Sequence, residues 1–159
     1  MNKKQEAIVV EDAQTVSIIR RSAALFYDLM LILALLVVAA ALAVLPAGMI
    51  FDYKIPADDF FYRLYLLSWP VGFFLWFWIR GGQTLGMRAW RIRVIRMDGN
   101  NLTYGDAVKR LLASILSILT AGLGYFWAMV DKNNRALHDH LSGTTLIMLK
   151  KVDRKKHKK

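Results

Sequence analysis

The residue best placed for unusual chemistry is Asp28, an acidic side chain at the edge of a long apolar stretch. Residues 29–50 follow it and contain no Asp, Glu, Lys or Arg. An ionised carboxylate at the centre of a membrane helix costs about 2.5–3.5 kcal/mol on insertion scales, so such residues are normally paired or functional. Asp28 is therefore a candidate for binding or relaying charge.

Two arginines could set the ionisation of Asp28. Arg21 lies seven residues earlier, on the same helix face, but two helical turns separate the backbones by roughly 10 Å, so no direct pair within the helix is expected. Arg110 stands just before the apolar stretch 111–130, and we expect it to be the partner of Asp28.

A second polar cluster, residues 133–144, contains His138, Asp139 and His140. Histidine and carboxylate side chains bind metals and transfer protons. The two histidines point apart in a helix or a strand, so we assign no metal site and keep His138 and Asp139 as charge-relay candidates. The other interpretation of Asp139 is structural, as a cap or a partner of backbone amides near Gly143.

The sequence contains few features that indicate an enzyme. It has no cysteine, which excludes disulfides and thiolate chemistry, and no Walker loop, His-Glu-x-x-His or Gly-x-Ser-x-Gly motif. We expect no catalytic residues, no cofactor and no enzymatic activity.

These polar residues must be positioned by strongly apolar elements. Hydrophobic residues make up 56% of the 159, and the stretches 29–50, 64–79 and 111–130 lack Asp, Glu, Lys and Arg. They hold 22, 16 and 20 residues, whereas a spanning helix needs roughly 20. Lone segments must satisfy their backbone internally in lipid, which predicts helices. The fold class is an all-α membrane protein with two transmembrane helices and a third apolar segment.

The depth of Asp28 depends on where the first helix ends. Pro46 and Gly48 predict an end near Leu45, which leaves 17 residues after Asp28, roughly 25 Å, so the helix must begin before Asp28 and carry it into the membrane. The alternative is that residues 29–50 span alone and leave Asp28 at the interface. The second helix contains Pro70 and is expected to extend outward through residues 60–62.

Charge counts predict the orientation. Loop 51–63 holds 2 basic and 3 acidic residues, and loop 80–110 holds 7 basic and 2 acidic, so the first faces outward and the second the cytoplasm of a bacterial inner membrane. Residues 1–15 form a cytoplasmic tail, 16–150 the membrane domain and 151–159 a basic tail. The net charge of +10 is explained by anionic lipids rather than nucleic acid.

The third stretch leaves two alternatives. A full span would place the basic tail outside, against the positive-inside pattern. Gly122 and Gly124 favour a break, and a re-entrant hairpin packed against the first two helices would keep the C-terminus cytoplasmic. The β-prone runs 90–94 and 144–149 could pair as a small cytoplasmic ribbon, with Asp98-Gly99 as a turn after the first.

Several landmarks together resemble the RDD family of small bacterial membrane proteins. They are Arg21, Ala24 and Asp28 in the first helix, Gln83-Thr84-Leu85-Gly86 after the second, Arg93-Val94 with Asp98-Gly99, and Leu137-His138-Asp139 with Ser142-Gly143-Thr144. The family's arginine and two aspartates map to Arg21, Asp28 and Asp139, although Arg20 makes the first assignment ambiguous by one position. The resemblance implies an inner-membrane protein with a general transport role, including cation/proton exchange for some members.

Two functions remain open from the sequence. In the first, Asp28 and Asp139 bind or relay cations or protons while Arg21 and Arg110 set their ionisation; a homo-oligomer or a membrane partner would complete the pathway. In the second, the protein is a noncatalytic membrane scaffold or assembly factor with a basic cytoplasmic docking surface.

Overall fold

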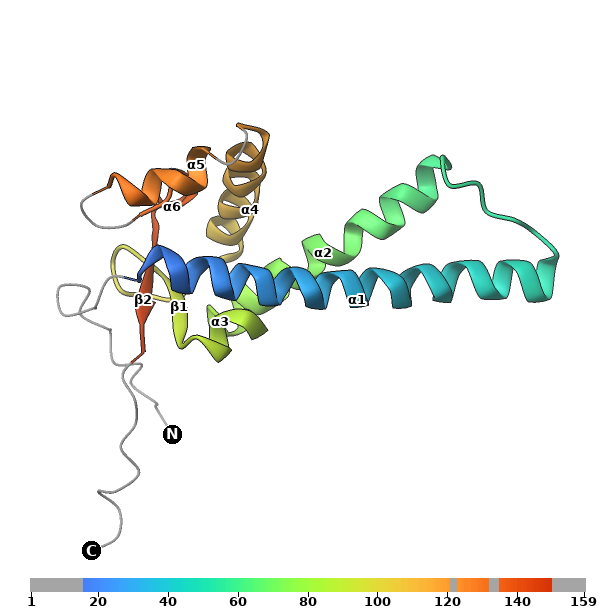
Figure 1. Ribbon diagram of the computed structural model, residues 1–159, viewed down its shortest axis with the longest axis horizontal. Coiled ribbons are helices and arrows are strands. Elements are labelled where there is room, and N and C mark those ends of the chain that lie inside the picture. The colour runs from blue at the N-terminus through green and yellow to red at the C-terminus, as the bar shows by residue number, and fades with distance from the viewer. Residues whose placement is uncertain (1–15, 121–122, 132–134, 150–159) are drawn as a thin grey trace, which may run out of the picture.

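The computed structural model describes residues 16–120, 123–131 and 135–149 and is mostly helical (Figure 1). Two long helices dominate it, α1 (Ile18–Phe51) and α2 (Phe60–Gly81). Both are long and apolar enough to cross a membrane, and among the described residues no other helix meets that test. The prediction of two long apolar helices is confirmed.

Helix α1 continues through Pro46 and Gly48 to Phe51, so the predicted end near Leu45 is wrong. Proline removes one helical hydrogen bond, and apolar helices tolerate that loss near an end. The backbone closes instead at Asp52, which adopts a left-handed conformation and donates its N–H to the carbonyl of Ala47. Residues 29–50 are therefore helical throughout and roughly 33 Å long. The premise for placing Asp28 deep in the membrane is removed.

Helix α2 begins at Phe60, as expected from the aromatic residues before the second apolar stretch. Asp59 caps it, because its carboxylate accepts the backbone N–H of Tyr62 at 2.7 Å. Pro70 lies inside the helix without ending it. Gly82, with φ of 64°, ends α2 in the left-handed conformation that glycine adopts at little cost.

One end of the molecule is a packed head, which comprises the first turns of α1 up to Asp28, the end of α2 from Phe74, and the described residues that follow, 82–120, 123–131 and 135–149. Its short elements are α3 (Leu85–Ala89), β1 (Ile92–Arg96), α4 (Tyr104–Leu119), α5 (Leu123–Phe126), the 3₁₀ turn η2 (Trp127–Met129), α6 (Leu137–Ser142) and β2 (Thr144–Met148). The remaining part, residues 29–73, is the arm. It consists of the two long helices, which separate away from the head (Figure 1).

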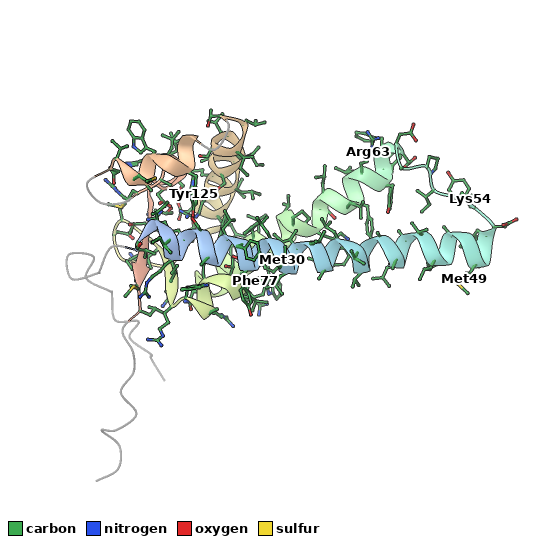
Figure 2. The ribbon with its side chains drawn as sticks, viewed as in Figure 1. Met30, Met49, Lys54, Arg63, Phe77 and Tyr125 are labelled. Carbon is green, nitrogen blue, oxygen red and sulfur yellow. The ribbon has the colours of Figure 1, made fainter. Side chains whose placement is uncertain are left out.

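The head contains the small core of the molecule. Its buried residues include Val16 near one end of the chain and Leu146 near the other, with Trp78, Ile92 and Val94 between them. Side chains on the arm instead point outward along most of its length, with Lys54 and Arg63 at the tip farthest from Tyr125 in the head (Figure 2). The two long helices therefore contribute to the core mainly at the head.

The predicted β-ribbon is present. Strands β1 and β2 pair antiparallel, with Ile92 opposite Met148 and Arg96 opposite Thr144. The predicted turn follows β1, where Gly99 has φ of 82°. The fold is therefore mostly helical with a two-stranded sheet, rather than all-α.

The third apolar stretch is broken, as its glycines predicted. Helix α4 ends at Leu119, and the chain resumes as α5 at Leu123; Gly122 lies outside the described residues. We expected Gly124 to pack against the first two helices, but it lies against α4, since a Cβ on it would be 2.6 Å from Ser117 Oγ. The stretch after the break therefore folds back along α4.

Candidate functional site

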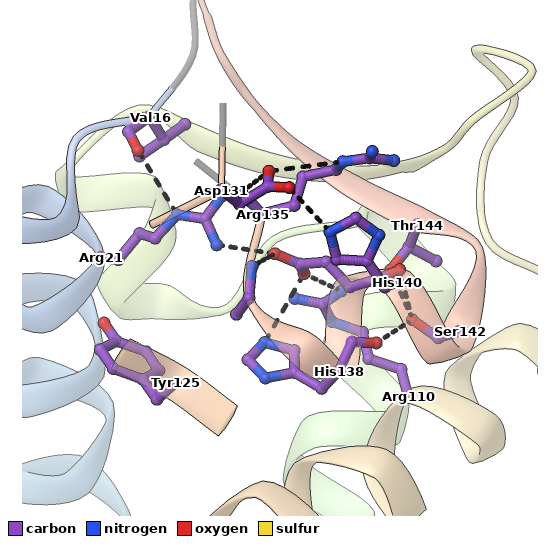
Figure 3. A network of polar contacts seen from close by, with 12 residues as sticks. Val16, Arg21, Arg110, Tyr125, Asp131, Arg135, His138, His140, Ser142 and Thr144 are labelled. Carbon is purple, nitrogen blue, oxygen red and sulfur yellow. Dashed lines mark hydrogen bonds and ion pairs between the residues drawn. The ribbon is translucent and has the colours of Figure 1, made fainter. Parts of the chain in front are cut away.

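The centre of the head is the carboxylate of Asp139, which is fully buried between two arginines (Figure 3). Arg21 of α1 donates from its Nη1 to Oδ2 at 2.7 Å, and Arg110 of α4 donates from its Nη1 to Oδ1 at 2.6 Å. The backbone N–H of Ala136 also donates to Oδ2 at 3.0 Å. Three elements, α1, α4 and α6, therefore meet at one carboxylate.

Hydroxyl groups extend this cluster to the sheet. Arg110 Nη1 also donates to Thr144 Oγ1 at the start of β2, at 2.5 Å. The hydroxyls of Thr144 and Ser142 are 2.7 Å apart, and Ser142 donates to the carbonyl of His138 at 2.6 Å. Arg21 Nε donates to the carbonyl of Val16 at 3.4 Å. We call Arg21, Arg110 and Asp139 the buried charge triad.

The electrostatics of the triad favour an ionised Asp139 beside a neutral His138. Burial alone would raise the pKa of Asp139, but the charges of Arg110 and Arg21, with the Arg21 hydrogen bond, hold that pKa well below its ordinary value. Burial, reinforced by the charge of Arg110, lowers the pKa of His138 to about 4. The imidazole Nε2 lies 3.6 Å from Asp139 Oδ1, and the ring stacks on Tyr125. At neutral pH the triad carries one net positive charge.

Asp28 forms a separate site on α1, two helical turns beyond Arg21. Its Oδ2 accepts the hydroxyl of Thr84 at 2.5 Å, and its Oδ1 accepts the backbone N–H of Gly86 at 2.8 Å. The hydroxyl of Thr84 in turn accepts the N–H of Met87 at 3.2 Å. Asp28 therefore anchors the first turn of α3 to α1.

Gly86 allows this close approach. A Cβ at that position would lie 2.2 Å from the carbonyl oxygen of Ala24 and 2.9 Å from Cγ of Asp28. Any larger residue must push α3 away from α1 and lengthen the bonds to the carboxylate. The small residues Ala24 and Gly86 are thus part of the Asp28 site.

The predicted pairing of Asp28 with Arg110 is wrong. Arg110 belongs to the buried charge triad, and Asp28 is satisfied by a hydroxyl and a backbone amide. The structure does bring Arg21, Arg110, Asp139 and His138 together, with Asp28 apart from them. Of the two adjacent arginines, Arg21 contacts the triad carboxylate through its Nη1, and the Arg20 side chain is exposed.

The structural interpretation of Asp139 describes its contacts, with one change. The carboxylate bonds the N–H of Ala136, at the start of α6, rather than an amide near Gly143. His140 lies on the exposed side of α6, where its Nε2 is 3.2 Å from Asp131 Oδ1. Within the described residues, no group of three His, Cys, Asp or Glu side chains could hold a metal ion.

Sequence reasoning did not assign Thr84, Gly86, Ser142 and Thr144 to a site. All four stand in the motifs Gln83-Thr84-Leu85-Gly86 and Ser142-Gly143-Thr144, which the resemblance had already singled out. Their short side chains give no charge or periodicity signal. Only the contacts with Asp28 and Arg110 give them a role.

Two apolar helices long enough to span a bilayer, joined to a head built on buried Arg and Asp side chains, define a membrane-type protein with a charged, folded end. The chain matches the RDD family over residues 15–143 and belongs to that family. It is also 29% identical over 75 residues to an uncharacterized protein of Rickettsia prowazekii (strain Madrid E), a match that covers 47% of this chain and 42% of the relative. The chain thus covers less than half of that relative's length. No solved structure matches.

Proposed function

We propose that the protein is a noncatalytic scaffold or assembly subunit of the bacterial cytoplasmic membrane, in which the RDD charges hold a folded head at the cytoplasmic end of two spanning helices. The observation that carries this proposal is the saturation of Asp139. Each of its oxygens already accepts a charged hydrogen bond from an arginine, and Oδ2 accepts a backbone N–H as well. A transported cation would have to displace these bonds and open the head.

The burial of the charge triad also supports a structural role. Arg21, Arg110 and Asp139 are at most 4% exposed, so ions have no open route to the carboxylate through the described residues. Breaking a buried ion pair leaves an uncompensated charge, at a cost of about 3–5 kcal/mol. A carboxylate that is bonded so firmly is better suited to stabilising the fold than to binding and releasing ions repeatedly.

Orientation and topology follow from the same contacts. Val16 and Leu146 pack in one core, and β1 pairs with β2, which supports both termini lying on one side of the membrane. The excess of basic residues over acidic ones in segment 80–110 favours the cytoplasm as that side. The acidic tip, with Asp52, Asp58 and Asp59, then faces outward. Anionic lipids are the expected partners of the basic residues beside the membrane.

Assembly is expected because the arm is incompletely covered. Large apolar side chains on α1 and α2 are exposed along its length, among them Leu33, Val37, Leu42 and Leu67. Lipid can cover such surfaces, and so can helices of a second copy or of another membrane protein. We propose that the protein works as a homo-oligomer or with a membrane protein partner.

Cation or proton transport is the second candidate, and Asp28 is the observation that favours it. This carboxylate is held by one hydroxyl and one backbone amide, and within the described part of the chain no arginine pairs with it. Such a pair of bonds is easier to exchange for a proton or cation than the two arginines on Asp139. Two helices cannot enclose a pathway, so this activity would require an oligomer.

One reconstitution experiment separates the two candidates. Purified protein in liposomes is tested for dissipation of a pH or sodium gradient, and membranes are crosslinked in parallel. We expect no flux above protein-free vesicles and a stoichiometric crosslinked complex. Flux in the wild type that is lost in Asp28→Asn, but kept in the matched control Asp58→Asn at the exposed tip, would establish transport and overturn the scaffold proposal.

A further inference from the structure

Helix α4 has two faces of unusual character. Its buried face carries Ala107, Arg110, Ala113 and Ser117, which pack in the head. Its opposite face is exposed and apolar, with Tyr104, Val108, Leu112, Ile115, Leu116 and Leu119. Leu112 and Leu119 are 61% and 77% exposed. Arg110 lies inside and the large apolar residues lie outside, which is the reverse of a helix on a water-soluble domain.

The direction of α4 matters as much as its faces. Helix α4 runs across α1 rather than along it, with α6 on one side and the arm extending away on the other (Figure 1). Since its buried face contacts α6, its apolar face is turned toward the arm. If α1 crosses the membrane, as the proposed function requires, α4 lies roughly parallel to the membrane plane.

The position of α4 along α1 and α2 is fixed by the triad. Arg110 bonds the same carboxylate as Arg21 near the start of α1, and its guanidinium lies 5.3 Å from the ring centroid of Trp78 near the end of α2. On either side of Trp78 along α2, Arg80 stacks 4.1 Å from the ring centroid of Trp76, whose side chain is exposed. Exposed tryptophan beside arginine is typical of a membrane interface. Helix α4 thus lies where the arm meets the head.

We propose that α4 is an in-plane membrane helix, with its apolar face among the acyl chains of the cytoplasmic leaflet. Apolar exposure also continues along the chain: Ile118 is exposed on α4, and Trp127, Met129 and Val130 are exposed beyond the break. An interfacial helix of this kind lies in the interface plane and buries its apolar face roughly 5–10 Å into the boundary between headgroups and acyl chains. The third apolar stretch is then neither a span nor a deep re-entrant hairpin.

Length and charge favour lipid over a second protein. Sixteen residues make a helix about 24 Å long, too short to cross the hydrocarbon even if it were upright. Lys109 borders the apolar face, in the position from which a lysine reaches anionic headgroups while its stem stays in lipid. The arm, which lipid covers in the proposed function, directly adjoins this face.

Single cysteines give a direct test, because the chain has none. An environment-sensitive fluorophore is attached at Val108→Cys, Leu112→Cys, Ile115→Cys or Leu119→Cys in the full chain reconstituted in vesicles with anionic lipid. Quenching is compared for aqueous iodide, a headgroup-level quencher and a quencher deep on the acyl chain. Val37→Cys on the arm is the deep control, and Asn100→Cys in the turn after β1 is the aqueous control.

We expect all four α4 labels to be quenched most by the headgroup-level quencher and to the same extent. Depth that increases steadily from residue 108 to 119 would show a span or hairpin and overturn the proposal. Quenching by iodide along α4, or protection from every quencher, would overturn it in favour of water or a covering protein. Failure of the deep quencher at Val37→Cys would instead disprove membrane insertion itself, so the two failures are distinguishable.

Discussion

The head and the arm are built on opposite rules. In the head, Arg21, Arg110 and Asp139 are buried and paired, and the core is small; in the arm, large apolar side chains are exposed and the charged residues stand at the tip. Water would favour the reverse arrangement in both regions. The contrast fits an arm solvated by lipid and a head that is held together mainly by directed polar bonds.

The buried charged residues of the head join different pairs of elements. Arg21 and Asp139 join α1 to α6, and Arg110 adds α4 and β2. Asp28 joins α1 to α3. Each aspartate thus joins one short element of the head to the long helix α1.

The largest effect is expected for Asp139→Asn. Removing the negative charge leaves Arg21 and Arg110 buried with two positive charges, and the free energy of unfolding should fall by about 3–5 kcal/mol. Chemical unfolding in detergent micelles measures it. Asp106→Asn is the control, because Asp106 lies near the surface, where it caps the start of α4 and pairs with Arg96, and its loss should cost about 1 kcal/mol. Equal effects of the two substitutions would contradict a central role for the triad.

The next effect is a pH dependence set by His138. Its pKa is about 4 in the folded protein against 6.5 ordinarily, so the unfolded chain binds the proton first as the pH falls. The contribution of neutral His138 to stability is therefore fully present above pH 6.5. As the pH falls toward 4, the free energy of unfolding decreases by up to about 3 kcal/mol. Unfolding measured between pH 7 and pH 4 should lose most of this slope in His138→Asn. The matched control His140→Asn, exposed on the same helix, should keep it.

Gly86→Ala should have a somewhat smaller effect, about 1–3 kcal/mol, because the new Cβ would collide with the carbonyl of Ala24 and with Asp28. Gly72→Ala is the control in the arm, where a Cβ meets nothing within 4 Å. Thermal unfolding of the two variants compares them. A neutral Gly86→Ala would mean that α3 is not closely docked on α1.

The smallest effect should come from the arm. Leu33→Ala removes a side chain that is 57% exposed, so the unfolding free energy in micelles should change by about 0.5 kcal/mol or less. Ile92→Ala, the same kind of truncation in the head, should cost about 2–5 kcal/mol, since Ile92 is buried in the core. Similar losses at both positions would abolish the distinction between the two regions.

The sequence predicted the arm better than the head. Runs without charge identify α1 and α2 because lipid imposes length and apolarity, and alternation with a turn identified the β-ribbon. The end of α1 was missed because Pro46 is a weaker stop in an apolar helix than in a soluble one. The break after Leu119 followed from the two glycines, although Gly124 packs on α4 rather than on the long helices.

The pairing of the charges was beyond sequence reasoning. Arg21 and Asp139 are 118 residues apart, and both Asp28 and Asp139 were plausible acceptors for Arg110 on charge alone. Small residues decide which aspartate pairs with Arg110. Thr84 and Gly86 donate the hydrogen bonds that Asp28 accepts, and Thr144 accepts a hydrogen bond from the same Arg110 that pairs with Asp139. Such bonds have no periodicity, so they become visible only in three dimensions.

The most direct test of the structural role of the triad is a double-mutant cycle between Arg21→Gln and Asp139→Asn, followed by the unfolding free energy in micelles. If the two side chains form the bond that fastens α6 to α1, the cycle should give a coupling energy of about 2–3 kcal/mol, with the double variant less damaged than the sum of the single ones. Additivity within about 0.5 kcal/mol, as for residues that do not touch, would contradict the account.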